Sequence, residues 1–357
     1  MITQKDVARL AGVSISTVSR VLNKSALVDK ETKITVESAI KELDYKPNLV
    51  AYGLRAQKSK LIGILMPELD HNAYGQFTQR IEEISLSRGY GLLVGLHHNE
   101  CETEKRLIDE FQRRNIDGLI LSPVVNSSDS THHLQNCIHV PAVLFQNGRS
   151  CETMSNVEID NYQAGRIAAE YLLSLGHKQI FCTAGPADIT FTHTRLQGFL
   201  ERLREAGIRL GQNQIFSCEF NYQKANYLNG IEAVAAFFDS KNSQARPTAI
   251  WAHNDNVAAG IIRGLHLRNI RIPEEVSVVG MDNMSITEML YPSLTTIGQP
   301  FAAMAEKAVE LLLENINFPD ESIAEEVLVP PKLIIRESSG ICSTPSSHPD
   351  TFIPGHR

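Results

Sequence analysis

From Lys60 onward, short apolar segments alternate with amphipathic segments of helical length, and this alternation restricts the possible folds more than any other feature. The strand-sized apolar segments are residues 61–69, 90–96, 117–123, 141–147, 178–186, 249–255 and 276–282. Between them, the apolar periodicity predicts helices over residues 77–88, 102–115, 162–175, 194–206 and 257–267. Strands that are apolar throughout and alternate with helices predict parallel sheets covered on both faces. Because about 280 residues exceed what one core usually holds, we expect an α/β body of two such lobes.

The first 45 residues carry a different pattern, which is typical of three short helices. Thr3 can cap the first helix, and Gly12 can end it in the left-handed conformation that glycine readily adopts. Ser14 can cap the second helix, and the third begins at Asp29 or Lys30. Two helices joined by a tight turn that contains glycine, braced by a third helix, predict an all-α helix-turn-helix domain.

The charge is divided unevenly along the chain. The net charge is −7, yet residues 1–60 hold 11 Lys and Arg against 6 Asp and Glu, a net of +5 that leaves −12 for the remainder. A small basic domain on a large acidic body predicts that the N-terminal domain alone binds a polyanion.

The second predicted helix supplies side chains that suit the major groove of DNA. Ile15, Ser16 and Thr17 are small enough to enter the groove at the start of this helix. Arg20 can donate two hydrogen bonds to guanine or one to a phosphate. The alternative is a purely structural three-helix domain, in which Arg20 is a solvated surface charge.

The segment DVARLAGVSISTVSRVLN, followed by LDYKPN, resembles the N-terminal signature of the lactose-repressor (LacI/GalR) family of bacterial transcription regulators. The resemblance extends from Thr3 to Leu54. It implies that Ile15 and Ser16 choose the operator and that Arg20 contacts a base. It also implies that three further residues lie near phosphates, namely Ser14, Thr17 and Asn23.

Residues 47–59 join the basic domain to the body. The resemblance implies that this stretch forms paired hinge helices on DNA, in which Leu54 opens a minor-groove step. Two helical turns are too few for a stable isolated helix in water, so a plain linker is the alternative. The expected set of DNA contacts is completed by Thr3, Asn48 and Ala51.

Polar residues follow the predicted strands of the body, where ligands of such folds bind. Their carboxylate, amide, guanidinium and aromatic groups suit a polyhydroxylated ligand. These residues are Asp70 to Tyr74, Gln146, Asn147, Phe191 to Arg195, Asn254, Asp255, Asp282 and Asn283. The alternative is that several of them cap the following helices, and for Asp255 and Asn283 we favour this alternative.

The body, from Leu61 to Arg336, also resembles the periplasmic-binding-protein-like effector domain of the same family, through stretches such as NIDGLILSP, AHNDNVAAG and IPEEVSVVGMDN. The resemblance implies effector contacts from Tyr74, Gln146, Arg195, Phe220, Asn254 and Asp282, with Gln299 and Phe301 near the crossover between the lobes; Phe191 completes our set. The sequence departs from the family pattern at two places. The Asn-Pro-aromatic motif reads His71-Asn72-Ala73-Tyr74, and the Asp that often grips hydroxyls is Gln146.

Other functions find little support. The six cysteines are scattered, there is no phosphate-binding glycine loop, and no nucleophile lies at a suitable spacing from a base. We therefore expect no enzyme, no cofactor and no metal, and we expect His97-His98 and His132-His133 to be solvated. The chain has neither an export leader nor an apolar stretch long enough to cross a membrane, which favours the cytoplasm and the nucleoid.

These observations together predict a repressor of a carbohydrate-utilisation operon that acts as a homodimer on a pseudo-palindromic operator and responds to a sugar-like effector. The alternatives are a cytosolic sugar-binding protein without regulatory DNA binding and a regulator that depends on a co-repressor.

We expect the helix-turn-helix domain over residues 1–46, the hinge over 47–59 and the effector domain over 60–337. Within the latter, the N-lobe takes 60–160 and 293–322 and the C-lobe takes 161–292 and 323–337, before a disordered tail over 338–357. We expect the helix near Ala302–Leu313 to be core.

Overall fold

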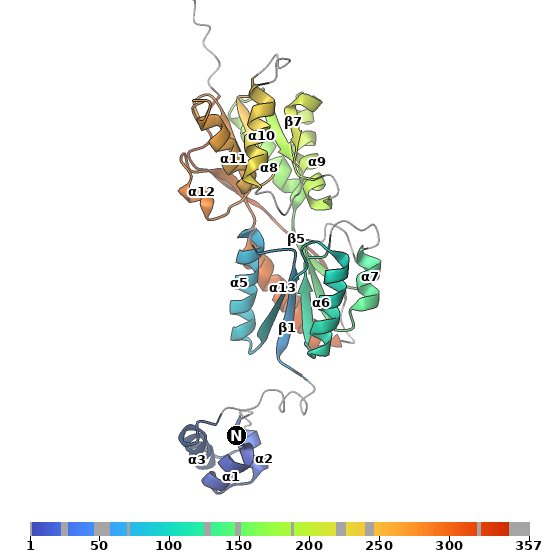
Figure 1. Ribbon diagram of the computed structural model, residues 1–357, viewed down its shortest axis with the longest axis vertical. Coiled ribbons are helices and arrows are strands. Elements are labelled where there is room, and N and C mark those ends of the chain that lie inside the picture. The colour runs from blue at the N-terminus through green and yellow to red at the C-terminus, as the bar shows by residue number, and fades with distance from the viewer. Residues whose placement is uncertain are drawn as a thin grey trace, which may run out of the picture. The chain divides into compact units, whose positions relative to one another are not determined.

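The computed structural model describes residues 2–22, 28–45, 58–69, 72–124, 130–146, 151–186, 189–218, 226–239, 246–319 and 323–342. They belong to two compact units, Met1–Lys60 and Leu61–Arg357 (Figure 1).

The described part of the N-terminal unit contains the helices α1 (Gln4–Ala11), α2 (Ile15–Leu22) and α3 (Lys30–Glu42). The carboxylate of Asp6 accepts the Thr3 backbone N–H at 3.0 Å, and Asp29 Oδ1 accepts the Thr32 N–H at 2.9 Å, so α1 and α3 begin where the capping pattern predicts. Gly12 has a φ of +66° and ends α1. The three helices bury a common core of Val7, Ala8, Ala11, Val18, Val21, Val36, Ala39 and Tyr45.

The larger unit contains two six-stranded sheets. The strand order of the first is β11-β5-β4-β3-β1-β2, with β1 (Leu61–Met66), β2 (Gly91–Leu96), β3 (Gly118–Leu121), β4 (Ala142–Phe145), β5 (Ser155–Ile159) and β11 (Glu326–Val329). The order of the second is β12-β10-β9-β8-β6-β7, with β6 (Ile180–Ala184), β7 (Ile215–Ser217), β8 (Ala249–Trp251), β9 (Ser277–Asp282), β10 (Thr295–Gly298) and β12 (Lys332–Ile334). Neighbouring strands are parallel except β10 and β12. The two-lobed α/β architecture with parallel sheets is confirmed.

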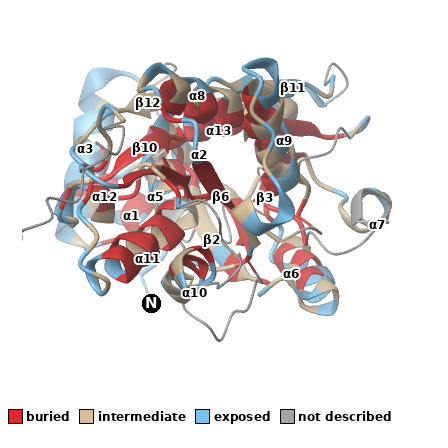
Figure 2. Ribbon diagram, turned by 90° about the horizontal axis from the view of Figure 1, so that it is seen from above, coloured by how far each residue is buried: buried red, intermediate tan, exposed pale blue. Residues whose placement is uncertain are grey.

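Helices cover both faces of each sheet, as Figures 1 and 2 show. The first sheet lies between α5 (Asn72–Ser87) and α13 (Phe301–Asn317) on one face and α6 (Cys101–Arg113) and α7 (Ser130–Cys137) on the other. The second sheet lies between α8 (Asn161–Ser174) and α9 (Thr190–Glu205) on one face and α10 (Tyr227–Phe238) and α11 (Asp255–His266) on the other. The described residues of this unit also form the short helix α12 (Ile286–Met289) and the 3-10 turn Gln212–Gln214.

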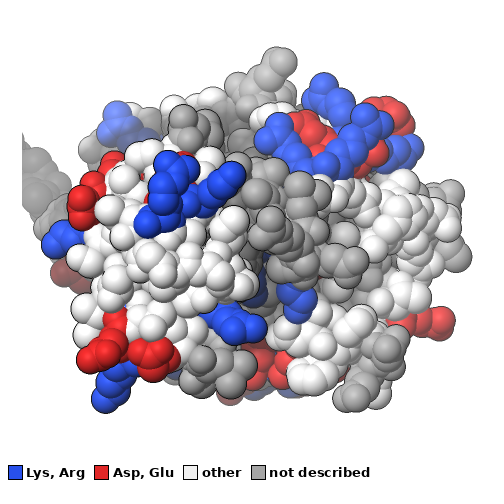
Figure 3. All heavy atoms as spheres, turned by 90° about the horizontal axis from the view of Figure 1, so that it is seen from below, with Lys and Arg blue, Asp and Glu red and all other residues white. Residues whose placement is uncertain are grey.

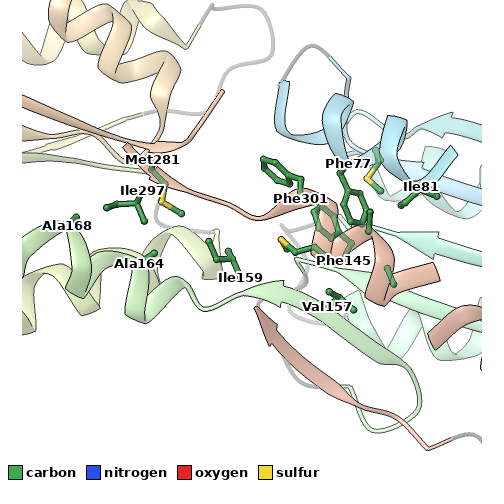
Figure 4. Packing of buried hydrophobic residues seen from close by; sticks show 14 of the residues in the cluster. Phe77, Ile81, Phe145, Val157, Ile159, Ala164, Ala168, Met281, Ile297 and Phe301 are labelled. Carbon is green, nitrogen blue, oxygen red and sulfur yellow. The ribbon is translucent and has the colours of Figure 1, made fainter. Parts of the chain in front are cut away.

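One hydrophobic cluster continues from one lobe into the other (Figure 4). Phe77 and Phe145 stack in the first lobe with their ring centroids 3.5 Å apart, and Phe301 of α13 belongs to the same cluster. Met281 and Ile297 continue it in the second lobe. The residues of α13 that face the first sheet are buried, which confirms that this helix is core: Met304, Ala305, Ala308, Val309 and Leu312.

The predicted boundaries between the lobes were wrong after residue 292. Residues 295–298 form β10, which pairs with β9 in the second sheet rather than lying in the first lobe. Residues 326–329 form β11, which pairs with β5 in the first sheet rather than lying in the second lobe. Backbone pairing decides both places, because the N–H and C=O groups of a strand need partners, and these strands find them in the other lobe. The chain therefore crosses between the lobes after β5, after β10 and after β11.

Two further expectations were wrong. The tail does not begin at Ser338: this residue is fully buried, its hydroxyl donates to the Val278 carbonyl oxygen at 2.6 Å and it accepts the Thr295 N–H at 2.8 Å. Cys342 still donates its N–H to the Leu175 carbonyl oxygen, while residues 343–357 lie outside the described residues. His97 is not solvated but fully buried, because its ring hydrogen-bonds within the first lobe.

Candidate functional site

The exposed face of α2 carries the side chains predicted to contact DNA. Val18 and Val21 are buried against α1 and α3, which leaves Ser16 and Arg20, one turn apart, exposed on the opposite face. Ile15 is 44% exposed at the start of the helix and does not belong to the core of the unit. The helix therefore presents a short apolar tip followed by a hydroxyl and a guanidinium.

Ser14 fixes the start of α2. Its Oγ accepts the Thr17 backbone N–H at 3.1 Å and lies 2.7 Å from Ser16 Oγ and 2.9 Å from Thr17 Oγ1. Thr3 is the N-cap residue of α1 instead, where both its hydroxyl, at 2.7 Å, and its backbone N–H, at 3.0 Å, donate to the Asp6 carboxylate. The other residues of the predicted DNA contact lie outside the described residues, namely Asn23, Asn48, Ala51 and Leu54.

Surface charge alone does not mark a contact surface. Seen from below, Lys and Arg side chains form several separate groups, and some of these lie beside Asp and Glu side chains (Figure 3). In the N-terminal unit, Arg9 pairs with Asp6 at 3.2 Å and Lys33 with Glu37 at 3.8 Å. The shape and chemistry of the exposed face of α2 therefore carry more information than the net charge.

A chain of buried hydrogen bonds joins the two lobes. Gln146 follows β4 of the first lobe, and its Nε2 donates to Gln299 Oε1 at 2.7 Å. Gln299 lies between β10 and α13, and its own Nε2 donates to Asp282 Oδ1, at the end of β9, at 2.6 Å. Gln146 and Asp282 are 6% and 2% exposed. The structure thus brings together three of the predicted effector residues, from the carboxyl ends of strands in both lobes.

The backbone at both ends of this chain is strained. Gln146 has a φ of +51° and Asp282 a φ of +114°, a region that residues with a side chain rarely adopt. Such conformations cost of order 1–3 kcal/mol and are concentrated at functional sites. The strain supports the choice of these two strand ends as the candidate site.

Arg195 lies on α9 and is 3% exposed. Its Nε and Nη2 donate to Asn161 Oδ1 at 3.2 and 2.9 Å, and its Nη1 donates to the His253 carbonyl oxygen at 2.6 Å. Burial lowers the pKa of its guanidinium, whereas the charges of Asp282 and Asp255 act to raise it. The Phe191 ring centroid lies 6.0 Å from the guanidinium carbon. Arg195 is therefore held rigidly in the second lobe, within electrostatic range of Asp282.

Tyr74 of α5 faces the same region from the first lobe. Burial, opposed by a hydrogen bond with Ser122, raises the pKa of its phenol to about 12, and the charges of Asp282 and Arg195 also act on it, in opposite directions. Its ring meets Phe145 edge-on, with the centroids 6.4 Å apart. Tyr74 is therefore a neutral hydroxyl beside the ends of β3 and β4. Phe220, Asn147, Asp70 and His71 lie outside the described residues.

Asn254, rather than the expected Asp255, caps the following helix. Asn254 caps α11, because its Oδ1 accepts the Val257 N–H at 2.8 Å. Asp255 is no cap: it is fully buried, and its oxygens accept the Thr296 hydroxyl at 2.7 Å and the Met284 N–H at 2.8 Å. Asn283 is no cap either, since its Oδ1 accepts from Arg336 at 2.9 Å. Burial above all, and then the charge of Asp282, raises the pKa of Asp255 well above its usual range.

The sequence reasoning missed Asn161 and His253, which hold Arg195. Asn161 lies two residues after the end of β5, so the rule that placed the other candidates at strand ends would have found it had β5 been recognised. Among the described residues, no group of three or more His, Cys, Asp and Glu side chains could hold a metal ion. Within the same ranges, no helix combines the length and the apolar character needed to span a membrane.

Comparison with known families accounts for both units. Residues 3–48 match the bacterial regulatory proteins of the lacI family, and residues 169–339 match the periplasmic binding protein-like domain. The chain is 32% identical to the HTH-type transcriptional repressor PurR of Klebsiella pneumoniae, over 95% of this chain and 97% of that one.

Two solved structures support the same assignment. One is the lac repressor dimer bound to operator and the anti-inducer ONPF, with a TM-score of 0.83 and 27% identity, over 95% of this chain and 99% of that chain. The other is a LacI family transcriptional regulator from Enterococcus faecium with bound ribose, with a TM-score of 0.68 and 28% identity, over 79% and 100%. The chain belongs to the lacI family of bacterial regulatory proteins, and it is a DNA-binding transcriptional regulator, not an enzyme, that carries an effector-binding domain.

Proposed function

We propose that this regulator is a repressor of carbohydrate utilisation and that a sugar-like effector, bound between its lobes, changes its affinity for operator DNA. The observation that carries the proposal is the meeting of Tyr74, Gln146, Gln299 and Asp282 from the two lobes, with Arg195 within electrostatic range. Amides, a carboxylate and a guanidinium can donate to and accept from the hydroxyls of a sugar. The related regulator with bound ribose supports this ligand class.

On DNA, we propose a homodimer that binds a pseudo-palindrome, as the related lac repressor dimer binds its operator. Ile15, Ser16 and Arg20 enter the major groove, and Leu54 of each protomer reaches the minor groove at the centre. Because the proposed operator lies on the bacterial chromosome, we propose that the protein acts in the cytoplasm. An effector that binds one arrangement of the lobes better than the other shifts the dimer towards that arrangement and changes operator affinity by the same free-energy difference.

The first experiment is selection of bound fragments from genomic DNA by the purified protein. A recurring pseudo-palindrome supports the proposal, and the genes beside it indicate the pathway of the effector. Binding that is salt-sensitive but indifferent to sequence contradicts it, because phosphate contacts alone give that behaviour.

Arg20→Ala is expected to weaken binding to the selected operator about 10- to 100-fold, since a base contact by arginine contributes about 1–3 kcal/mol. The matched control is Lys33→Ala, which removes the same charge from an exposed residue of α3. Fluorescence anisotropy with labelled operator measures both. Equal losses for the two variants would mean that Arg20 contributes only its charge.

Asp282→Asn is expected to abolish the response to effector, because it removes the one buried carboxylate that receives the Gln299 amide. Release of operator by effector, titrated at fixed protein concentration, measures this. Asp239→Asn, at an exposed ion pair with Arg268 in the same lobe, is the control and should respond normally. A normal response of the Asp282 variant would remove this residue from the effector site.

A further inference from the structure

We propose that the effector carries an acidic group, a carboxylate or a phosphate, which becomes the counter-ion of Arg195; this inference rests on the proposed function and narrows its ligand class to acidic sugars and sugar phosphates.

The first observation is that Arg195 forms no ion pair with any residue that the structure describes. It is buried, yet its three hydrogen bonds all go to neutral oxygens, two to the amide of Asn161 and one to the carbonyl of His253. Within the described ranges, no carboxylate oxygen lies within the 4.0 Å that defines an ion pair with its nitrogens. Arginine is almost never fully buried without a charged partner.

The guanidinium also has hydrogen-bonding capacity left. It carries five N–H groups, of which Nε supplies one and each Nη supplies two. The three bonds above leave one N–H on Nη1 and one on Nη2. Two charge-assisted hydrogen bonds to one carboxylate or phosphate are the strongest contact that such a pair of donors makes.

The two described carboxylates whose charges act on Arg195 accept hydrogen bonds from other groups. Asp255 receives the Met284 N–H and the Thr296 hydroxyl, and burial favours its neutral form. Asp282 receives the Gln299 amide. Both influence Arg195 through space only, so they compensate part of its charge without pairing with it.

Among the described residues of the first lobe, the two side chains that reach this site carry no negative charge. Gln146, where the family pattern has an Asp, is neutral, and its amide is engaged with Gln299. Tyr74 keeps its proton at physiological pH. A site with Asp at position 146 would carry one more negative charge. With Gln146 in its place, the site repels an anion less.

The test uses the full chain and pairs of compounds that differ only in the acid: glucose with glucuronate and glucose 6-phosphate, galactose with galacturonate, and ribose with ribose 5-phosphate. Thermal shift followed by calorimetry gives the affinities. We expect at least one acid to bind at least tenfold more tightly than its neutral parent, and the uronates and phosphates separate the two kinds of acid. Inorganic phosphate and sulfate are included, so that stabilisation by those ions alone, an adventitious ion only, counts against the proposal.

Two variants test the residues. Gln146→Asp restores a carboxylate to the first lobe and is expected to reduce the preference for the acid at least tenfold. Arg195→Met is expected to remove the preference, while Arg195→Lys keeps part of it. Since Gln146→Asp changes one side chain of similar size at the end of β4, it keeps the test valid if the Arg195 variants do not fold.

Two results would overturn the inference: neutral parents that bind as tightly as their acids, or a panel in which no acid binds. Operator selection on the same preparation separates these results from failure of the proposed function. A protein that selects its operator and binds neutral sugars has the proposed function with a different ligand class.

Discussion

Replacing Gly165 with alanine is expected to destabilise the second lobe by about 3 kcal/mol or more. A Cβ at Gly165 of α8 would lie 2.0 Å from the Arg195 carbonyl oxygen and 2.7 Å from the Phe199 nitrogen, both in the backbone of α9. Backbone atoms cannot rotate away, so the two helices must separate by more than an ångström. Separation loosens the packing of Phe199 and Leu203, which are fully buried. Overpacking of this kind costs about 1–3 kcal/mol, and more where the backbone must move.

The sign of this effect is informative, because alanine normally favours a helix by about 1 kcal/mol over glycine. Urea unfolding of the full chain measures it. Gly207→Ala is the control: Gly207 has a φ of +80° and no atom within 4 Å of the added Cβ, so it should lose only the about 1–2 kcal/mol of left-handed strain. A Gly165 variant as stable as the natural protein would show that α8 and α9 can part without loss. Since the clash involves the Arg195 backbone, a folded variant should also bind effector less well.

The sequence predicted the elements whose apolar pattern is strong and missed those that are stabilised by polar contacts. The runs that became β1, β3, β4 and β9 are apolar throughout. β5, which reads SNVEI, is not, although Ser155 and Asn156 are buried in it. The amide of Asn156 donates to Glu326 of β11 at 2.8 Å, so a residue 170 positions away satisfies it. No local pattern reveals such a partner, and the lobe boundaries failed at this same pair of strands.

The sequence predicted which residues form the candidate site but not which hydrogen bonds join them. The ends of parallel strands nominated Gln146 and Asp282 because the topology of such sheets brings them to one edge. The bond from Gln146 to Gln299 joins residues 153 positions apart and depends on how the two lobes face each other. That Asn254 rather than Asp255 caps α11 has a different cause. Both are good capping residues, and only the position of the Thr296 hydroxyl and the Met284 N–H decides which of them turns inward.

Glu104→Gln is expected to stabilise the protein by about 3 kcal/mol at pH 8. Glu104 is fully buried in the first lobe, where its Oε1 accepts the Val124 N–H at 2.8 Å. Burial raises its pKa from 4.5 to about 7, against the smaller effects of that hydrogen bond and of Lys105. The folded protein therefore binds a proton that the unfolded chain has released, and stability falls as the pH rises from about 4.5 to about 7. A glutamine keeps the acceptor without this cost.

The stability that His97 contributes changes with pH in the opposite direction, over nearly the same pH range. Its Nε2 lies 2.8 Å from the Ser122 carbonyl oxygen and its Nδ1 accepts the Asn99 N–H at 3.1 Å, which requires a neutral ring that donates through Nε2. Burial above all, and then the charge of His98, lowers its pKa from 6.5 to about 4. Stability due to His97 is therefore present above pH 6.5 and is lost as the pH falls through about 4.

The two groups hold the same segment, Ser122 to Val124, and their pH dependences nearly cancel in the natural protein. Glu104→Gln removes one of them, so the stability of this variant should rise by about 3 kcal/mol between pH 4 and pH 6.5 and then stay level. Urea unfolding at half-unit pH intervals measures the profile, with the exposed Glu310→Gln as the control. A profile identical to that of the natural protein would mean that Glu104 titrates normally. Because Ser122 also hydrogen-bonds Tyr74, a change in the Glu104 profile would report on the segment that lies beside the candidate site.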